Sequence, residues 1–77
     1  QWKLISEAIE RDFVFKNFSE ALAFIIQSGI AAEKMNHHPE IFNVYNKVKI
    51  RLNTHSVQGI TDLDFDLAKK LDAIFAK

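Results

Sequence analysis

Two stretches near the N-terminus have the pattern of apolar and polar residues that predicts β-strands. The first, residues 2–5, is short and apolar and predicts an edge strand, followed by a turn at residues 6–7. The second, residues 8–16, alternates between apolar and charged side chains, although Arg11 and Val14 interrupt the alternation. We expect an antiparallel strand whose buried side carries Ile9, Phe13 and Phe15.

A long apolar helix is predicted from residue 17 to about residue 34. Asn17 is a good N-cap, and Glu20 stands three residues later, where a capping-box acid is found. The helix is apolar over more than one face, so it must bury a second side. A chain this short offers few other elements to cover that side, and we therefore predict a homo-oligomer. The main stripe consists of Phe18, Leu22, Ile25, Ile26 and Gly29, and the apolar residues outside it are Phe24, Ile30 and Ala31.

Residues 41–44 and 47–54 predict a hairpin of two strands. Asn46 tolerates left-handed geometry and should form the tight turn at residues 45–46. In the second strand alternate residues are apolar, and by parity His55 continues the outward-facing set. The residues expected to face the core are Val48, Ile50 and Leu52.

The last helix follows a loop at residues 58–59. Thr61 is its predicted N-cap, with Asp64 at the capping-box position. Its buried stripe should contain Leu67, Ala68, Leu71, Ile74 and Phe75.

The order of elements is strand, strand, helix, strand, strand, helix, and hairpins join most neighbours. This order favours the α+β class, with a four-stranded antiparallel sheet and two helices packed on one face. The 77 residues are enough for one domain, residues 1–77, near the lower limit for an independent core.

Composition excludes several classes of function. Ten basic and ten acidic residues give a net charge of zero, so we expect no direct contact with nucleic acid. The absence of cysteine removes disulfides and thiolate metal sites and suits the cytoplasm. No apolar run approaches the roughly 18 residues that would indicate a membrane span, and residues 1–77 show neither a signal-peptide pattern nor a glycine-rich phosphate loop.

Two adjacent histidines, His37 and His38, stand where the first helix should end. Pro39 disfavours helical geometry for the residue before it, which places the helix end ahead of this corner. With His55 they would suit general acid and base catalysis, or a three-histidine zinc site. Adjacent residues on an extended chain point in opposite directions, which argues against His37 and His38 binding one metal.

Structural roles would also explain these residues one at a time. His37 would cap carbonyl groups left open at the helix end. Asp64 is explained as a capping acid in the first turn, Glu33 as a solvated helix residue, and His55 as an outward residue at a strand end. The residues by themselves leave these alternatives open.

The spacing of six residues resembles the signature of a known family, the pterin-4a-carbinolamine dehydratases. The segment Phe-Asn-Val-Tyr-Asn-Lys-Val at residues 42–48 is also similar to the family's central hairpin. The resemblance runs from about Trp2 into the last helix. The six residues are Glu33, His37, His38, Tyr45, His55 and Asp64, with Pro39 directly after the histidine pair.

The resemblance implies a hydro-lyase that converts 4a-hydroxytetrahydropterin to quinonoid dihydropterin and water, in the recycling of tetrahydrobiopterin. Such enzymes need no metal and no cofactor of their own, because the pterin is the substrate. Their subunits pair to extend the sheet, and in many members the dimers join again through helices, which implies a dimer or a tetramer. Animal members also act as dimerisation cofactors of a homeodomain transcription factor. The alternative is therefore a non-catalytic interaction or coactivator module of the same fold, present in the nucleus as well as the cytoplasm.

Carried over by position, His37, His38 and His55 would line the pterin pocket. His37 and His55 would transfer protons, one to the departing hydroxyl and one from a ring nitrogen, and His38 would bind or orient the substrate. Asp64 would set the charge or tautomer of a histidine, and Glu33 would support the corner. Hydrogen bonds to the pterin would come from Asn36, Asn53, Thr54 and Ser56.

The chain departs from the family pattern in two places. Members usually carry a further N-terminal helix before the first strand, so we expect either a trimmed product or a short natural form. Many members have an aromatic residue where Ile41 stands. If that ring stacks on the pterin, binding should be weaker here.

Overall fold

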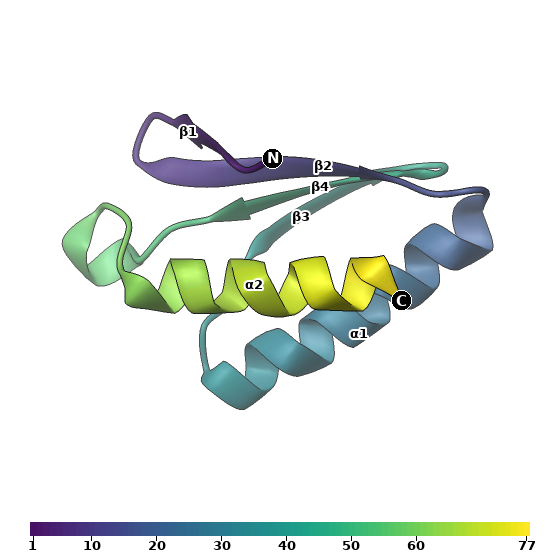
Figure 1. The fold of residues 1–77 in the computed structure, drawn as a ribbon. Helices are drawn as coiled ribbons and strands as arrows, with labels where there is room; N and C mark the ends of the chain where they lie inside the picture. Colours follow the sequence, from purple (N-terminus) through teal and green to yellow (C-terminus); the bar gives the residue numbers. More distant parts are fainter.

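Two layers make up the chain, a four-stranded antiparallel sheet and two helices that cover one of its faces (Figure 1). The computed structural model describes every residue, 1–77. The strands lie in the order β1-β2-β4-β3, and the predicted α+β architecture is confirmed. The elements are β1 (Lys3–Ile5), β2 (Ala8–Val14), α1 (Phe18–Met35), β3 (Glu40–Val44), β4 (Lys47–Leu52), the short 3₁₀ helix η1 (His55–Val57) and α2 (Asp62–Ala76).

The sheet buries the face on which apolar residues alternate. Ile9 of β2 is opposite Leu52 of β4 and Phe13 is opposite Val48, so all four side chains point toward the helices. All four are buried in the core. Both strands end two residues before their predicted limits, β2 at Val14 and β4 at Leu52.

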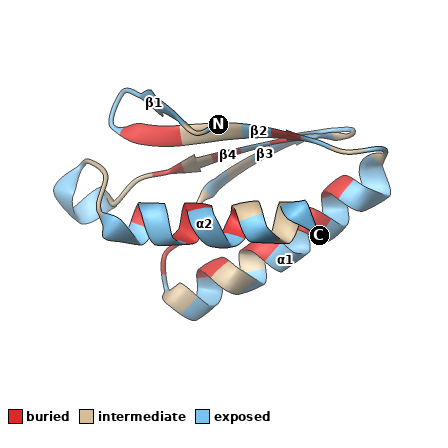
Figure 2. Ribbon diagram, in the orientation of Figure 1, coloured by how far each residue is buried: buried red, intermediate tan, exposed pale blue.

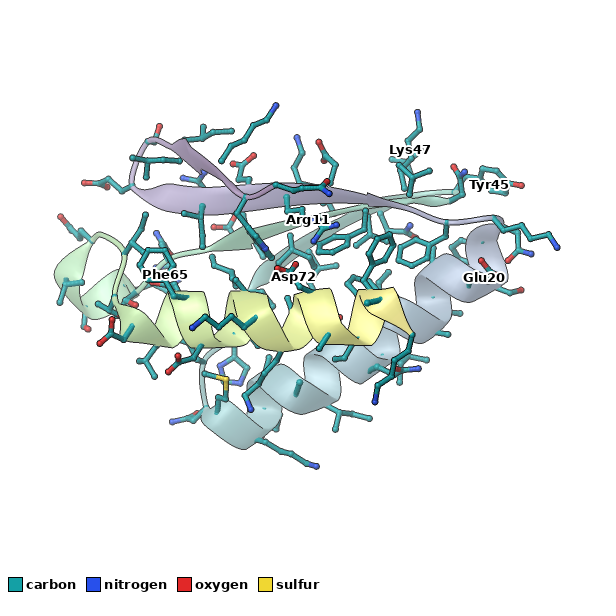
Figure 3. The ribbon with its side chains drawn as sticks, viewed as in Figure 1. Arg11, Glu20, Tyr45, Lys47, Phe65 and Asp72 are labelled. Atoms are coloured by element: carbon teal, nitrogen blue, oxygen red, sulfur yellow. The ribbon has the colours of Figure 1, made fainter.

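Arg11 also lies on the buried face of β2, so the alternation that it was expected to interrupt is intact. Its guanidinium carbon is 4.4 Å from the ring centre of Phe13 and 5.1 Å from that of Phe75. Its Nη1 contacts the carboxylate of Asp72, which also accepts a hydrogen bond from Trp2 Nε1 at 2.9 Å. Figure 3 shows Arg11 and Asp72 between β2 and α2. A counter-ion and two aromatic rings together stabilise an arginine at this inward position.

The turn between β3 and β4 has its left-handed residue at Tyr45, with φ of 52°, and not at Asn46 as predicted. The side chain of Asn43 donates to the carbonyl groups of Tyr45 and Lys47 at 3.2 and 2.9 Å and holds the turn. Asn46 instead donates to the carbonyl of Phe15 at 2.9 Å. Its amide therefore connects the turn to the segment that follows β2.

Helix α1 begins at the predicted cap. Asn17 Oδ1 accepts the backbone N–H of Glu20 at 2.9 Å. The carboxylate of Glu20 accepts the N–H of Lys16 at 3.1 Å, one residue before the position that a capping box would use. One of the open N–H groups of the helix, that of Glu20, is thus satisfied, and the N–H just before the cap also has a partner.

The prediction about which face of α1 is the main apolar stripe was wrong. The helix buries a face of smaller residues and one phenylalanine, Ala21, Phe24, Ser28 and Ala32. The larger residues Phe18, Leu22, Ile26 and Ile30 are each between 42% and 55% exposed. Small residues let α1 approach the sheet and α2 closely, and Figure 2 shows the mixture of buried and exposed colours along the helix. The exposed apolar stripe of α1 is defined here as Phe18, Leu22, Ile26 and Ile30.

Helix α2 forms with the predicted cap and the predicted buried stripe. Thr61 and Asp64 make a complete capping box. Leu67, Ala68 and Leu71 are buried, and Ile74 and Phe75 pack against the core from half-buried positions. Two of the rings, those of Phe75 and Phe13, meet edge-on with centres 5.1 Å apart.

The outer face of the sheet has charges of both signs and also exposes three apolar side chains, Val14, Phe42 and Val44. Arg51 of β4 is opposite Glu10 of β2 and Glu40 of β3, with N–O distances of 2.6 and 3.6 Å. Opposite charges on facing strands stabilise their pairing. None of the helices has the length and apolar character needed to cross a membrane.

Candidate active site

The corner after α1 has the geometry that Pro39 predicts. The helix ends at Met35, and Asn36 takes left-handed geometry with φ of 51°. The backbone N–H of Asn36 donates to Glu33 O at 3.0 Å, and that of His37 donates to Ala32 O at 3.1 Å. These bonds satisfy carbonyl groups at the helix end, so the backbone N–H groups of Asn36 and His37 are fixed to the last turn of α1.

His55 lies in a 3₁₀ helix, which corrects the expectation that it continues β4. The strand ends at Leu52, and the backbone N–H of Thr54 donates to Gly59 O at 2.7 Å, closing a short loop. Gln58, with φ of 53°, gives this loop its left-handed residue. Figure 1 shows that η1, the start of α2 and the end of α1 lie at the same end of the molecule.

One pocket collects the residues that the resemblance had assigned to substrate binding. All seven of them line it, and Leu63 of α2 is the one further lining residue. His37, His38 and His55, which come from loops 17 or more residues apart in sequence, therefore face a single cavity. The seven residues are Asn36, His37, His38, Asn53, Thr54, His55 and Ser56.

Asp64 lies behind this pocket and is fully buried. Its Oδ1 is 2.6 Å from Nε2 of His37. Its Oδ2 accepts the hydroxyl of Thr54 and the backbone N–H of Thr61, each at 2.9 Å. A buried carboxylate with hydrogen bonds to both oxygens is satisfied, so Asp64 caps α2 and also holds the ring of His37.

The other two histidines have different surroundings. His38 Nε2 is 2.7 Å from Glu33 Oε1, and both side chains are mostly exposed. Glu33 thus contacts the histidine corner, as the resemblance had implied. His55 is exposed and has no side-chain hydrogen bond within the chain. The ring of His37 is therefore buried and bonded to Asp64, the ring of His38 is exposed and paired with Glu33, and the ring of His55 is exposed without a side-chain partner.

Nowhere in the chain do three or more His, Cys, Asp or Glu side chains come close enough together to hold a metal ion. Ile41 packs against the hydrophobic core and does not line the pocket. Tyr45, at the tip of the hairpin, does not line it either (Figure 3).

Sequence reasoning missed two residues of this region. Leu63 supplies the only apolar lining of the pocket, and Thr61 contacts Thr54 through its hydroxyl at 2.8 Å. Thr61 was recognised only as a helix cap. Asp64, three residues after Thr61, identifies the cap in the sequence. The contact between Thr61 and Thr54 forms only when the loop between them is folded, so the sequence did not show it.

Comparisons with known proteins agree on one family. Residues 1–74 match the family described as Pterin 4 alpha carbinolamine dehydratase. A relative from Sinorhizobium medicae, named "Putative pterin-4-alpha-carbinolamine dehydratase", is 56% identical in an alignment 73 residues long that covers 92% of this chain and 70% of the relative. A relative of the same name from Chelativorans sp. is 51% identical in an alignment 79 residues long. The alignment covers 100% of this chain and 81% of that relative.

Two solved structures share the fold. A transcriptional coactivator/pterin dehydratase from Brucella melitensis superposes with a TM-score of 0.92 at 49% identity, over 95% of this chain and 80% of the other. A pterin dehydratase-like protein, identified as a RuBisCO assembly factor in the alpha-carboxysome, superposes with a TM-score of 0.79 at 18% identity, over 97% and 87%. The second likeness concerns the fold alone. With the family match over nearly all of its length and relatives above 50% identity, this chain belongs to the pterin-4a-carbinolamine dehydratase family.

Proposed function

We propose that the protein dehydrates 4a-hydroxytetrahydropterin to quinonoid dihydropterin and water, as part of the recycling of tetrahydrobiopterin in the cytoplasm. The observation that carries the proposal is that three imidazoles from two separate loops line one pocket, in a chain of this family. Imidazole can both donate and accept a proton near neutral pH. The elimination of water needs both events.

The reaction breaks the bond between C4a and the hydroxyl oxygen and forms a double bond from C4a to a ring nitrogen. The departing hydroxyl takes a proton from one histidine and leaves as water, while the ring nitrogen loses a proton to another. We assign these two steps to His37 and His55, and substrate orientation to His38. The anchored ring of His37 supports a fixed role, and the free ring of His55 supports one that adjusts to the substrate. No metal or cofactor is needed for this chemistry.

The test is dehydration of synthetic carbinolamine by the wild type and by His37→Ala and His55→Ala, after subtraction of the uncatalysed rate. Loss of a general acid or base should lower turnover by about 10²–10⁴-fold. Ser19→Ala, a change on an exposed position of α1, is the control and should keep wild-type turnover. Equal rates for the wild type and both histidine variants would end the proposal.

A second candidate function is a protein-interaction module, either self-association or a coactivator role. The exposed apolar stripe of α1 favours it, because a row of four large apolar side chains on one helix face is typical of an interface. We propose that a second copy of the chain covers this stripe in a homo-oligomer. A catalytic pocket and an interface stripe lie on different parts of the chain, so the two functions are compatible.

Size-exclusion chromatography with light scattering tests the oligomer. A wild type that stays monomeric at high concentration would remove the self-association proposal. A heterologous partner would then be the remaining use for the stripe.

A further inference from the structure

A chain of hydroxyl hydrogen bonds connects the start of α2 to the carboxylate behind the pocket. The backbone N–H of Leu63 donates to Thr61 Oγ1 at 3.3 Å. Thr61 Oγ1 and Thr54 Oγ1 are 2.8 Å apart, and Thr54 Oγ1 is 2.9 Å from Asp64 Oδ2. Four consecutive groups are thus in hydrogen-bond contact.

The direction of each bond in this chain is determined. A carboxylate has no proton to give, so the Thr54 hydroxyl donates to Asp64. A hydroxyl has one proton, so Thr54 can only accept from Thr61, and Thr61 must donate to Thr54. The Thr61 hydroxyl still has a lone pair for the Leu63 N–H, as helix capping requires. Thr61 therefore has two separate tasks, one as an acceptor and one as a donor.

The same reasoning assigns the proton on His37. Asp64 Oδ2 is occupied by the hydroxyl of Thr54 and the N–H of Thr61, which leaves Oδ1 as the acceptor for His37 Nε2. The proton between them belongs to Nε2. The other ring nitrogen, Nδ1, has no partner in the chain and is not sealed from solvent. In a residue that lines the pocket, Nδ1 is the atom left for a substrate.

We propose that Thr61 is a positioning residue of this site: by fixing the hydroxyl of Thr54, it holds Asp64 so that His37 keeps its proton on Nε2 and offers Nδ1 to the pocket. Thr61 itself does not line the pocket, so it acts through the other two residues. The part of the proposal that concerns turnover rests on the proposed dehydratase function. The part that concerns the His37 ring does not.

The experiment is to record ring ¹⁵N chemical shifts of His37 in the protein without ligand, at about pH 9, above the ordinary titration range of imidazole. Thr61→Val removes the donor and keeps the shape, while Thr61→Ser retains the hydroxyl. Asn17→Ala removes the corresponding cap from α1, which matches the loss of helix stability without touching the site. The wild type, Thr61→Ser and Asn17→Ala should all show protonated Nε2. Thr61→Val should show a mixture of the two tautomers, because a Thr54 hydroxyl without its donor can rotate away from Asp64 and the carboxylate can then turn from His37 Nε2.

Turnover is measured on the same four proteins. Thr61→Val should lower kcat by about two- to tenfold, the factor expected for one hydrogen bond, with little change in KM. Thr61→Ser retains the hydroxyl and should have the kcat of the wild type. Unchanged ¹⁵N shifts in Thr61→Val would overturn the proposal and leave Thr61 as a helix cap only.

The outcomes separate this inference from the proposed function. A wild type without dehydratase activity, together with altered shifts in Thr61→Val, would reject the function and support the positioning role. Should Thr61→Val fail to fold, Thr54→Val applies the same test, because it removes the donor to Asp64 and leaves the cap intact. Unchanged His37 shifts in that variant would also overturn the proposal.

Discussion

Replacement of Asp64 by asparagine should invert the tautomer of His37 while leaving the fold in place. The asparagine amide has one oxygen and one NH₂ group. The groups around residue 64 determine which of them takes the Oδ1 position and which takes the Oδ2 position. Two donors, the Thr54 hydroxyl and the Thr61 N–H, point at the Oδ2 position. The amide oxygen must stay there, because the opposite orientation would leave two buried donors facing an NH₂ group, at about 1–3 kcal/mol each.

The NH₂ group then takes the Oδ1 position, 2.6 Å from His37 Nε2 in the parent structure. It can only donate, so Nε2 must become an acceptor and the ring proton must move to Nδ1. The nitrogen that faces the pocket would then carry a proton in the neutral ring and could no longer accept one. Under the proposed function, His37 is one of the two proton-transfer groups, and the wrong tautomer at this group should lower kcat by about 10²–10⁴-fold.

Stability should change much less than activity. The asparagine keeps the hydrogen bonds at Oδ2, and the loss of a negative charge at the helix N-terminus costs about 0.3–1 kcal/mol. Asp62→Asn, in the same turn of α2 but without a contact to His37, is the matched control for that charge. Thermal unfolding should report similar small losses for both variants, and only Asp64→Asn should lose turnover of the carbinolamine. Wild-type turnover in Asp64→Asn, or an unaltered His37 tautomer, would refute the reasoning.

Three further predictions concern stability and assembly. Phe13→Ala should lower the free energy of unfolding by about 3–5 kcal/mol, whereas Phe42→Ala, at a side chain 53% exposed, should cost far less; equal urea midpoints for the two would contradict the assigned core. Asp72→Ala removes the counter-ion of Arg11, whose side chain is 11% exposed. It should lower the free energy of unfolding in urea by about 2–4 kcal/mol, less than for a fully buried pair because Asp72 is partly exposed. A loss under about 0.5 kcal/mol, typical of surface changes, would show that the pair contributes little. Ile26→Glu should shift the protein from oligomer to monomer in light scattering without loss of the fold, and an unchanged mass would place the interface elsewhere.

Local patterns were enough to predict most elements of this fold. Alternation along β2 and β4, the cap residues Asn17 and Thr61, and Pro39 after the histidine pair each act over a few residues, and the structure agrees with them. The family signature could be read for the same reason, since it consists of residue types at fixed spacings. The architecture follows from these local signals, whereas seven of the eight pocket residues were named only through the resemblance and Leu63 was missed.

Errors arose wherever a distant contact decided the outcome. Three residues of the apolar stripe predicted for α1, Phe18, Leu22 and Ile26, turned out to be exposed, because the small residues on the other face allow closer approach to the sheet and α2. Arg11 was expected to interrupt the alternation along β2. It lies on the buried face instead, where its counter-ion is Asp72, 61 residues later. Asn46 did not take the left-handed position predicted for it at the hairpin, and its side-chain amide instead donates to the carbonyl of Phe15, 31 residues earlier.

The sequence by itself determined the kind of residues available for proton transfer, and the tertiary structure decided what distinguishes them. His37, His38 and His55 are chemically identical as side chains. Folding gives the first a buried carboxylate partner, the second an exposed one and the third none. Hydrogen-bond direction depends on donors and acceptors brought together in space, and so the tautomer of a histidine is a property of the folded chain.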